Sequence, residues 1–303
     1  MRSRSRRLPI RPVPAMTAIR RRPVVPCASG IRQDRRCESG PARVTTILLG
    51  LASGLLIATI TAPVGVSGAV FLLPVQLDVL HVPSPAVTPT NLLFNVIAIP
   101  GPLGRYHQQK QLGGHLTRLL VLGTLPGVVL GAVVRVHFAP GARLFRLLLA
   151  AMLLTLGVWL CARTLRRQPH QTVPSVSSPR PRTITVLALI VGFVGGIYGI
   201  GGGSLLGPIL VGRGMSVAVV APATLASTFL TSIVGVAAYA VLALTTAGNI
   251  APHWALGLTC GLGGLAGGYL GARLQPHLPN TALRLLLGVL ACALAAVYLI
   301  QAA

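Results

Sequence analysis

The sequence predicts an all-α, polytopic membrane protein with about eight transmembrane helices, arranged as two duplicated four-helix halves whose first helices are broken and rich in glycine. Three observations predict this class. Apolar residues make up 53% of the 303 residues, and charged residues only 10%. Several uncharged runs exceed the roughly 20 residues that a helix needs to cross a bilayer. Motifs of the first half also return in the same order in the second half.

The charge is almost entirely positive, with 26 lysines and arginines against three acids and a formal net charge of +23. Two of the acids, Asp34 and Glu38, lie in the basic N-terminal stretch, so Asp78 is the one carboxylate of the apolar body. Paired-carboxylate catalysis and acidic cation sites are therefore disfavoured. The five cysteines show no CxxC spacing, and neither a metal site nor a cofactor is expected.

The chain divides into four segments. Residues 1–43 hold 12 of the 26 basic residues and are expected to form a disordered tail, in which nothing favours a nucleic-acid partner. Two repeats follow, 44–162 and 183–303, joined at 163–182 by a linker rich in proline, serine and arginine. Each repeat is expected to contain four apolar elements, at 44–80, 86–104, 119–136 and 145–162, and then at 183–212, 216–245, 252–272 and 281–301.

The uncharged run at 183–212 is too long for one straight span. A helix of its 30 residues would measure about 45 Å, against about 30 Å of hydrocarbon. Four of the five residues from Gly199 to Gly203 are glycine, so the helix is expected to break there and to restart near Ser204. Successive N–H groups at a helix start form a cradle for an anion. The alternative is that glycine only lets neighbouring helices approach closely.

The first repeat contains a counterpart of this glycine-rich loop. Its first glycine, Gly65, precedes Pro74 by the same nine residues that separate Gly199 from Pro208. Ser67 interrupts the glycines of the first loop, so the second loop is expected to supply most of the contacts to an anion.

Amides and hydroxyls follow both loops at matching positions. Asn91 and Asn95 fall on Thr224 and Thr228 at an offset of 133, and the members of each pair share a helix face. Alternatively, the hydroxyls bond their own helix and the asparagines bond a neighbouring helix. The expected substrate-binding residues are Gly65, Ser67, Gly68, Asn91, Asn95, Gly199, Gly201, Gly202, Gly203, Ser204, Thr224 and Thr228.

Two membrane topologies are open. If each long first element crosses once, there are eight spans with parallel halves, and 20 basic residues lie on the N-terminal side against 6 on the other. If each first element turns back as a hairpin, the halves are inverted and the counts become 15 and 11. The positive-inside rule favours the first arrangement, with both termini and the linker in the cytoplasm.

Three motifs of the second repeat carry a resemblance to a known family. They are the glycine-rich stretch at 192–208, the segment 223–227 with Thr231 and Ser232, and Gly267-x-x-x-Gly271-Ala272-Arg273. Together they resemble the TauE/SafE sulfite exporter family. The resemblance implies a multi-pass transporter in the bacterial inner (plasma) membrane, without enzymatic activity, that moves sulfite, small sulfonates or related anions through the lipid bilayer.

A non-transporting membrane scaffold and an intramembrane enzyme are the alternatives. An enzyme would need a nucleophile beside a base, or a metal set, at membrane depth, and the sequence offers neither. A scaffold would tolerate bulky residues in both glycine-rich loops. The exact substrate, the direction of transport, the coupling ion and the oligomeric state are left open by the sequence.

Overall fold

The structure, a computed structural model, describes residues 40–84, 86–109, 114–138, 142–165, 181–213, 215, 217–245, 250–277 and 279–302. This part of the chain contains helices and no strands, as the all-α class predicts. The expected tail, apart from residues 40–43, and most of the expected linker lie outside the described residues. The first helix begins at Gly40, inside the segment assigned to the tail.

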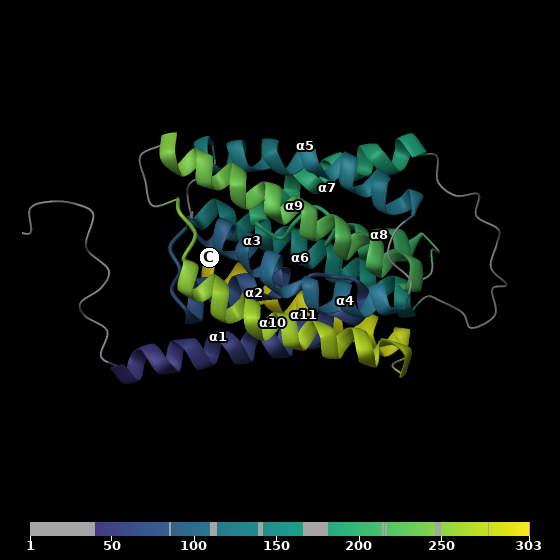
Figure 1. The fold of residues 1–303 in the computed structure, drawn as a ribbon, viewed down its shortest axis with the longest axis horizontal. Helices are drawn as coiled ribbons and strands as arrows, with labels where there is room; N and C mark the ends of the chain where they lie inside the picture. Colours follow the sequence, from purple (N-terminus) through teal and green to yellow (C-terminus); the bar gives the residue numbers. More distant parts are fainter. Residues whose placement is uncertain are drawn as a thin grey trace, which may run out of the picture. The chain divides into compact units, whose positions relative to one another are not determined.

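The first half contains six helices (Figure 1). They are α1 (Gly40–Thr61), α2 (Ala69–Pro74), α3 (Val87–Ala98), α4 (Pro100–Gln108), α5 (His115–His137) and α6 (Ala142–Leu165). A 3-10 turn (Ala62–Val64) follows α1, and a π-helical turn (Val75–Val79) extends α2. Only Ile99 separates α3 from α4, where Pro100 removes one backbone donor from the helix.

The second half follows the same order with fewer interruptions. Its helices are α7 (Pro181–Tyr198), α8 (Leu206–Gly212), α9 (Val217–Thr245), α10 (Trp254–Leu274) and α11 (Asn280–Ala302), with a 3-10 turn (Gln275–His277) after α10. Here α9 takes the place that α3 and α4 share in the first half.

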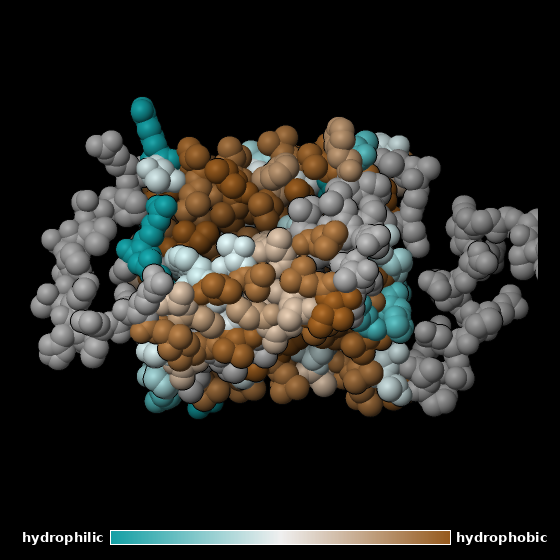
Figure 2. All heavy atoms as spheres, turned by 180° about the vertical axis from the view of Figure 1, so that it is seen from behind, coloured by the Kyte–Doolittle hydropathy of each residue, from teal (hydrophilic) through white to brown (hydrophobic). Residues whose placement is uncertain are grey.

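The bundle has the surface of a membrane protein. Four described helices are long and apolar enough to cross a bilayer, namely Val44–Val64, His115–His137, Val217–Thr245 and Trp254–His277, and shorter apolar helices accompany them. Large apolar side chains such as Leu48, Leu122 and Leu262 are exposed. Figure 2 shows hydrophobic side chains over the middle of the bundle and hydrophilic ones gathered toward its two ends. Such a band is what contact with lipid requires.

Glycines allow the close helix pairs. A Cβ added to Gly271 of α10 would lie 2.5 Å from the carbonyl oxygen of Thr59 in α1, closer than real Cβ atoms come. In the other half, a Cβ on Gly123 of α5 would meet Ala188 of α7 at 2.6 Å. The spaced glycines of these helices therefore serve helix contacts.

The order of these contacts gives the direction of each helix. Along α10, Gly263 meets Leu51, Gly267 meets Leu55 and Gly271 meets Thr59, so α1 runs parallel to α10. Gly257 meets Leu93, Gly261 meets Ile97 and Leu265 meets Gly101, so α3 and α4 also run parallel to α10. Because α1 and α3 point the same way, residues 65–86 carry the chain back along the bundle.

The second half repeats this return. Gly123 and Gly127 of α5 meet Ala188 and Leu189 of α7, and Thr124 and Val128 of α5 meet Ser227 and Gly235 of α9. Both α7 and α9 therefore run parallel to α5, and the residues between them return. Figure 1 shows the start of α1 and the C-terminus at one end of the bundle, with the end of α6 and the start of α7 at the other.

These directions disagree with the expected eight single spans. In that arrangement α1 and α3 would be antiparallel, whereas the contacts make them parallel. The counts of basic residues discriminate weakly between the two topologies, because the basic tail supplies most of the larger number in each.

Labelling with thiol reagents tests this arrangement. We expect Phe138→Cys and His277→Cys, each in a chain whose five native cysteines are replaced, to react from opposite faces of the membrane, because both positions are exposed at ends of the antiparallel helices α5 and α10. A membrane-impermeant reagent on intact cells should label one of the two variants. If the reagent labels both variants or neither on intact cells, and both react after lysis, the two positions lie on the same face of the membrane. That result would support the parallel eight-span arrangement.

Candidate functional site

Two non-helical segments lie inside the bundle, and both contact α9. The first loop is residues 65–68 and the second loop is residues 199–205, and all of these residues are buried. Gly65, Gly199 and Gly201 have φ angles of 75°, 71° and 74°, in the left-handed region that glycine adopts without strain. Non-helical backbone is tolerated at membrane depth only where protein or water satisfies it.

The two loops meet at Thr224. Its hydroxyl lies 3.0 Å from the carbonyl oxygen of Gly65 and 2.9 Å from that of Val220, and it can donate to either. Gly203 of the second loop packs so tightly on the carbonyl of Thr224 that a Cβ would not fit. At the start of α8, a Cβ on Gly207 would lie 3.0 Å from the carbonyl oxygen of Gly65. Loops from the two halves thus share one helix face.

Two asparagines of α3 hold the first loop. The hydroxyl of Ser67 donates to Oδ1 of Asn95 and accepts from the backbone N–H of Ala69 at 3.2 Å. Nδ2 of Asn91 donates to the carbonyl oxygen of Ala69 at 3.0 Å. These bonds fix the loop and the start of α2 against α3.

Several buried polar atoms here have no partner among the described residues. They are Nδ2 of Asn95, Oδ1 of Asn91 and Oγ1 of Thr61 beside the first loop, and Oγ of Ser232, which faces Gly201 of the second loop. A buried polar atom without a partner costs about 1–3 kcal/mol, so native proteins usually provide one, often a water or a ligand. Three of the four groups are able to donate, which suits the oxygens of an anion.

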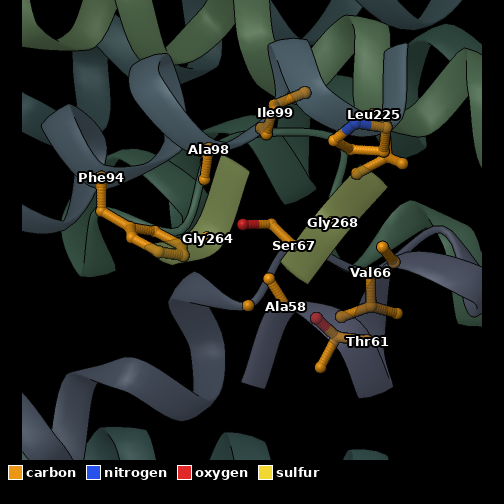
Figure 3. A pocket seen from close by; sticks show the side chains of 13 residues that line it. Ala58, Thr61, Val66, Ser67, Phe94, Ala98, Ile99, Leu225, Gly264 and Gly268 are labelled. Carbon is orange, nitrogen blue, oxygen red and sulfur yellow. The ribbon is translucent and has the colours of Figure 1, made fainter. Parts of the chain in front are cut away.

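A small cavity adjoins the first loop (Figure 3). Its volume is about 20 Å³, and it is mostly apolar, with the hydroxyls of Thr61 and Ser67 among its lining. Gly264 and Gly268 of α10 form part of its wall. This space holds about one water molecule. A sulfite-sized anion would fit only after the surrounding helices shift.

Threonines of α9 hold the second loop. The N–H of Gly202 donates to Oγ1 of Thr231 at 3.0 Å. The hydroxyls of Thr228 and Thr231 donate to carbonyls of their own helix at 2.8 Å and 2.7 Å, and Ser204 donates to Ile200 at 2.6 Å. The backbone N–H of Gly202 is therefore not available to an anion, because Thr231 already accepts its hydrogen bond.

The expected residues do not all come together. Ser67, Gly68, Asn91 and Asn95 form one group around the first loop, and Gly201, Gly202, Gly203, Ser204 and Thr228 form another around the second, with Thr224 and Gly65 between them. Gly199 lies apart, because its backbone packs against the carbonyl of Thr88 at the start of α3.

The sequence analysis missed Arg135 of α5. Its side chain is completely buried, with Nε 3.4 Å from the hydroxyl of Thr88, and it also donates to the hydroxyl of Ser84. An arginine near a helix end is usually interfacial, so the sequence did not indicate its burial. One available signal was the offset of 140 between the repeats, which places Gln275 at the equivalent position of the second half.

The comparison with protein families agrees with this architecture. The model of the family described as "Sulfite exporter TauE/SafE" matches residues 50–298. The chain belongs to the TauE/SafE family. This match contains both loops and every buried polar group described above, and the expected family is confirmed. No curated protein matches the chain, and no solved structure does.

Membership of the TauE/SafE family sets the class of activity. It makes the chain a membrane transporter of sulfite-type anions and not an enzyme. Among the described residues, no group of three or more histidine, cysteine, aspartate or glutamate side chains is placed to hold a metal ion.

Substitution of Gly202 tests the close packing of the second loop. A Cβ at this position would lie 2.5 Å from Cβ of Thr124, and Thr124 is tied to Leu120 and Ser227 by bonds of 2.7 Å and 3.0 Å. We expect Gly202→Ala to reduce anion transport about tenfold or more, since the loop must move away from Thr231. Gly104→Ala is the matched control, because a Cβ there meets nothing within 4 Å.

Initial uptake rates, compared at equal amounts of folded protein in the membrane, decide this prediction. Equal rates for the two alanine variants would show that the packing of the second loop does not matter for transport.

Proposed function

We propose that the chain carries small oxyanions such as sulfite or organosulfonates across the cell inner membrane, and that it binds them between the first and second loops. The observation that carries this proposal is the set of buried donors without partners beside the first loop, in Asn95 and Thr61. Membership of the TauE/SafE family supports the anion class.

The electrostatic setting favours an anion over a cation. Asp78 is the only carboxylate from residue 40 onward, and it lies in the π-helical turn (Val75–Val79), outside the groups around the loops. The groups around the loops are neutral amides, hydroxyls and backbone. Neutral donors replace the hydration of an anion and leave a bound cation without a counter-charge.

We further propose that the two halves are inverted repeats in the membrane. Exchanging the halves converts the packed pair α1–α10 into the packed pair α7–α5. The same exchange converts the pair α3–α9 into itself, and likewise the pair α6–α11. This pattern supports a two-fold relation that exchanges them. Secondary transporters built this way bind substrate near the midplane, where helices of both repeats are interrupted.

Flux measurements test the proposed activity. We expect purified full-length protein in liposomes to take up labelled sulfite or a small sulfonate such as sulfoacetate, and not rubidium, down an imposed gradient. Liposomes without protein give the background. Rubidium uptake without anion uptake would refute the proposal, and the absence of all flux from folded protein would favour a non-transporting scaffold.

The substitution Asn95→Asp tests whether Asn95 binds the anion. Asn95→Asp preserves shape but replaces the unpartnered N–H donors with a carboxylate oxygen, which repels an anion. We expect uptake to fall about tenfold to a hundredfold, the effect of losing one hydrogen bond to a charged ligand.

Gln108→Glu is the control for Asn95→Asp, since it adds the same charge at an exposed position of α4. Thermal unfolding in detergent should show both variants folded. If Asn95→Asp folds and transports like the Gln108 variant, Asn95 does not contact the anion.

A further inference from the structure

The helix ends that precede the two loops carry carbonyl groups that need donors. The last carbonyls of a helix have no donor within that helix, and they form the negative end of its dipole. The 3-10 turn (Ala62–Val64) and α7 both end directly before a loop. The chain meets part of this need itself, since the N–H of Gly65 returns to Ala62 and that of Ile200 returns to Gly195. The remaining carbonyls depend on other helices.

A tyrosine hydroxyl supplies a donor at the same place in each half. Tyr106 and Tyr239 are equivalent at the offset of 133, and both side chains are completely buried. The hydroxyl of Tyr239 donates to the carbonyl oxygen of Gly196 at 2.9 Å, and that of Tyr106 reaches Ala62 at 3.4 Å. Each acceptor lies three residues before the first glycine of its loop. The bond of Tyr106 is long for two oxygens and is therefore the weaker one.

The next carbonyl along the chain is also covered in each half, but by donors that are not equivalent. Nε2 of Gln275 donates to the carbonyl oxygen of Pro63 at 2.8 Å, and the hydroxyl of Thr88 donates to that of Ile197 at 3.3 Å. Gln275 follows α10, whereas Thr88 lies in the first turn of α3. Duplication alone therefore does not explain the cover, because the two halves reach it with different side chains.

These helix ends border the proposed site. Ala62 lines the cavity beside the first loop. At the other break, a Cβ on Gly195 of α7 would lie 2.6 Å from the carbonyl oxygen of Gly201, so the end of α7 touches the second loop. In transporters with broken helices, carbonyls at such ends coordinate sodium ions. Without their donors, the carbonyls would therefore favour a cation and repel an anion.

We propose that Tyr106 and Tyr239 are specificity-determining residues, whose hydroxyls cover the helix-end carbonyls so that the two breaks accept an oxyanion and not a metal cation. Gln275 and Thr88 complete this cover. Phenol, amide and hydroxyl groups are neutral donors, so they offset the negative end of a helix without adding a charge. The inference rests on the proposed anion transport, and it names the groups that exclude cations from the same site.

Two variants each remove one donor from this cover. Tyr239→Phe deletes only the hydroxyl, and Gln275→Met keeps the length of the side chain without the amide. We expect each to lower sulfite uptake in liposomes about tenfold, the effect of leaving one buried acceptor without its donor, and to admit rubidium. Rubidium uptake should be larger in Gln275→Met, because the charge of Arg135 acts on the surroundings of Tyr239 and repels a cation.

Two further variants calibrate the effect. Tyr106→Phe should change both fluxes in the same direction but less, in keeping with its longer hydrogen bond. Tyr269→Phe is the matched control, since Tyr269 of α10 is half-buried and lies outside these contacts, and it should transport like the wild type. Thermal unfolding in detergent identifies the folded variants. Rubidium uptake above that of liposomes without protein is the deciding readout, because a folded variant with weaker packing alone still excludes rubidium.

The outcomes separate this inference from the proposed function. Wild-type protein that carries no anion would refute both. Sulfite uptake by the wild type, with rubidium still excluded by folded Tyr239→Phe and Gln275→Met, would overturn the role of the cover alone. If Tyr239→Phe does not fold, Gln275→Met and Tyr106→Phe decide by the same readout.

Discussion

The structure depends on the need to satisfy non-helical backbone inside a bilayer. Both halves interrupt a helix at membrane depth, and hydrocarbon offers no partner for the exposed N–H and carbonyl groups. Side chains of α3 and α9 supply partners, with Asn91 bonded to Ala69 in the first half and Thr231 bonded to Gly202 in the second. The polar faces of α3 and α9 therefore support the loops as well as bordering the candidate site.

This constraint also explains why the candidate site is uneven. In the second half, the threonine hydroxyls are used by the loop and by their own helix. In the first half, bonding to the loop leaves one atom of each asparagine amide without a partner among the described residues. An amide has two functional ends, so it can hold a loop with one and offer the other. The first loop, and not the glycine-rich second loop, therefore has the larger share of free donors.

Much of the architecture could be predicted from the sequence because it depends on spacing. Glycine positions, the return of motifs at fixed offsets and the lengths of apolar runs predicted the helices and the loops. The direction of the returning segments could not be predicted, because hydrophobicity has no direction and the tail dominates the basic counts. The burial of Arg135 also depends on tertiary packing, since the same residue at the same distance from a helix end is often interfacial.

The hydroxyl of Thr224 has a consequence for movement. It lies almost equally far from an acceptor in the other half, Gly65, and from one in its own helix, Val220. When a hydrogen bond between two bodies breaks inside a protein, the usual penalty is a donor stranded without an acceptor. Here the donor has a second acceptor within reach at every moment. Loss of the bond to Gly65 would therefore leave no unsatisfied hydroxyl donor at this contact between the two halves.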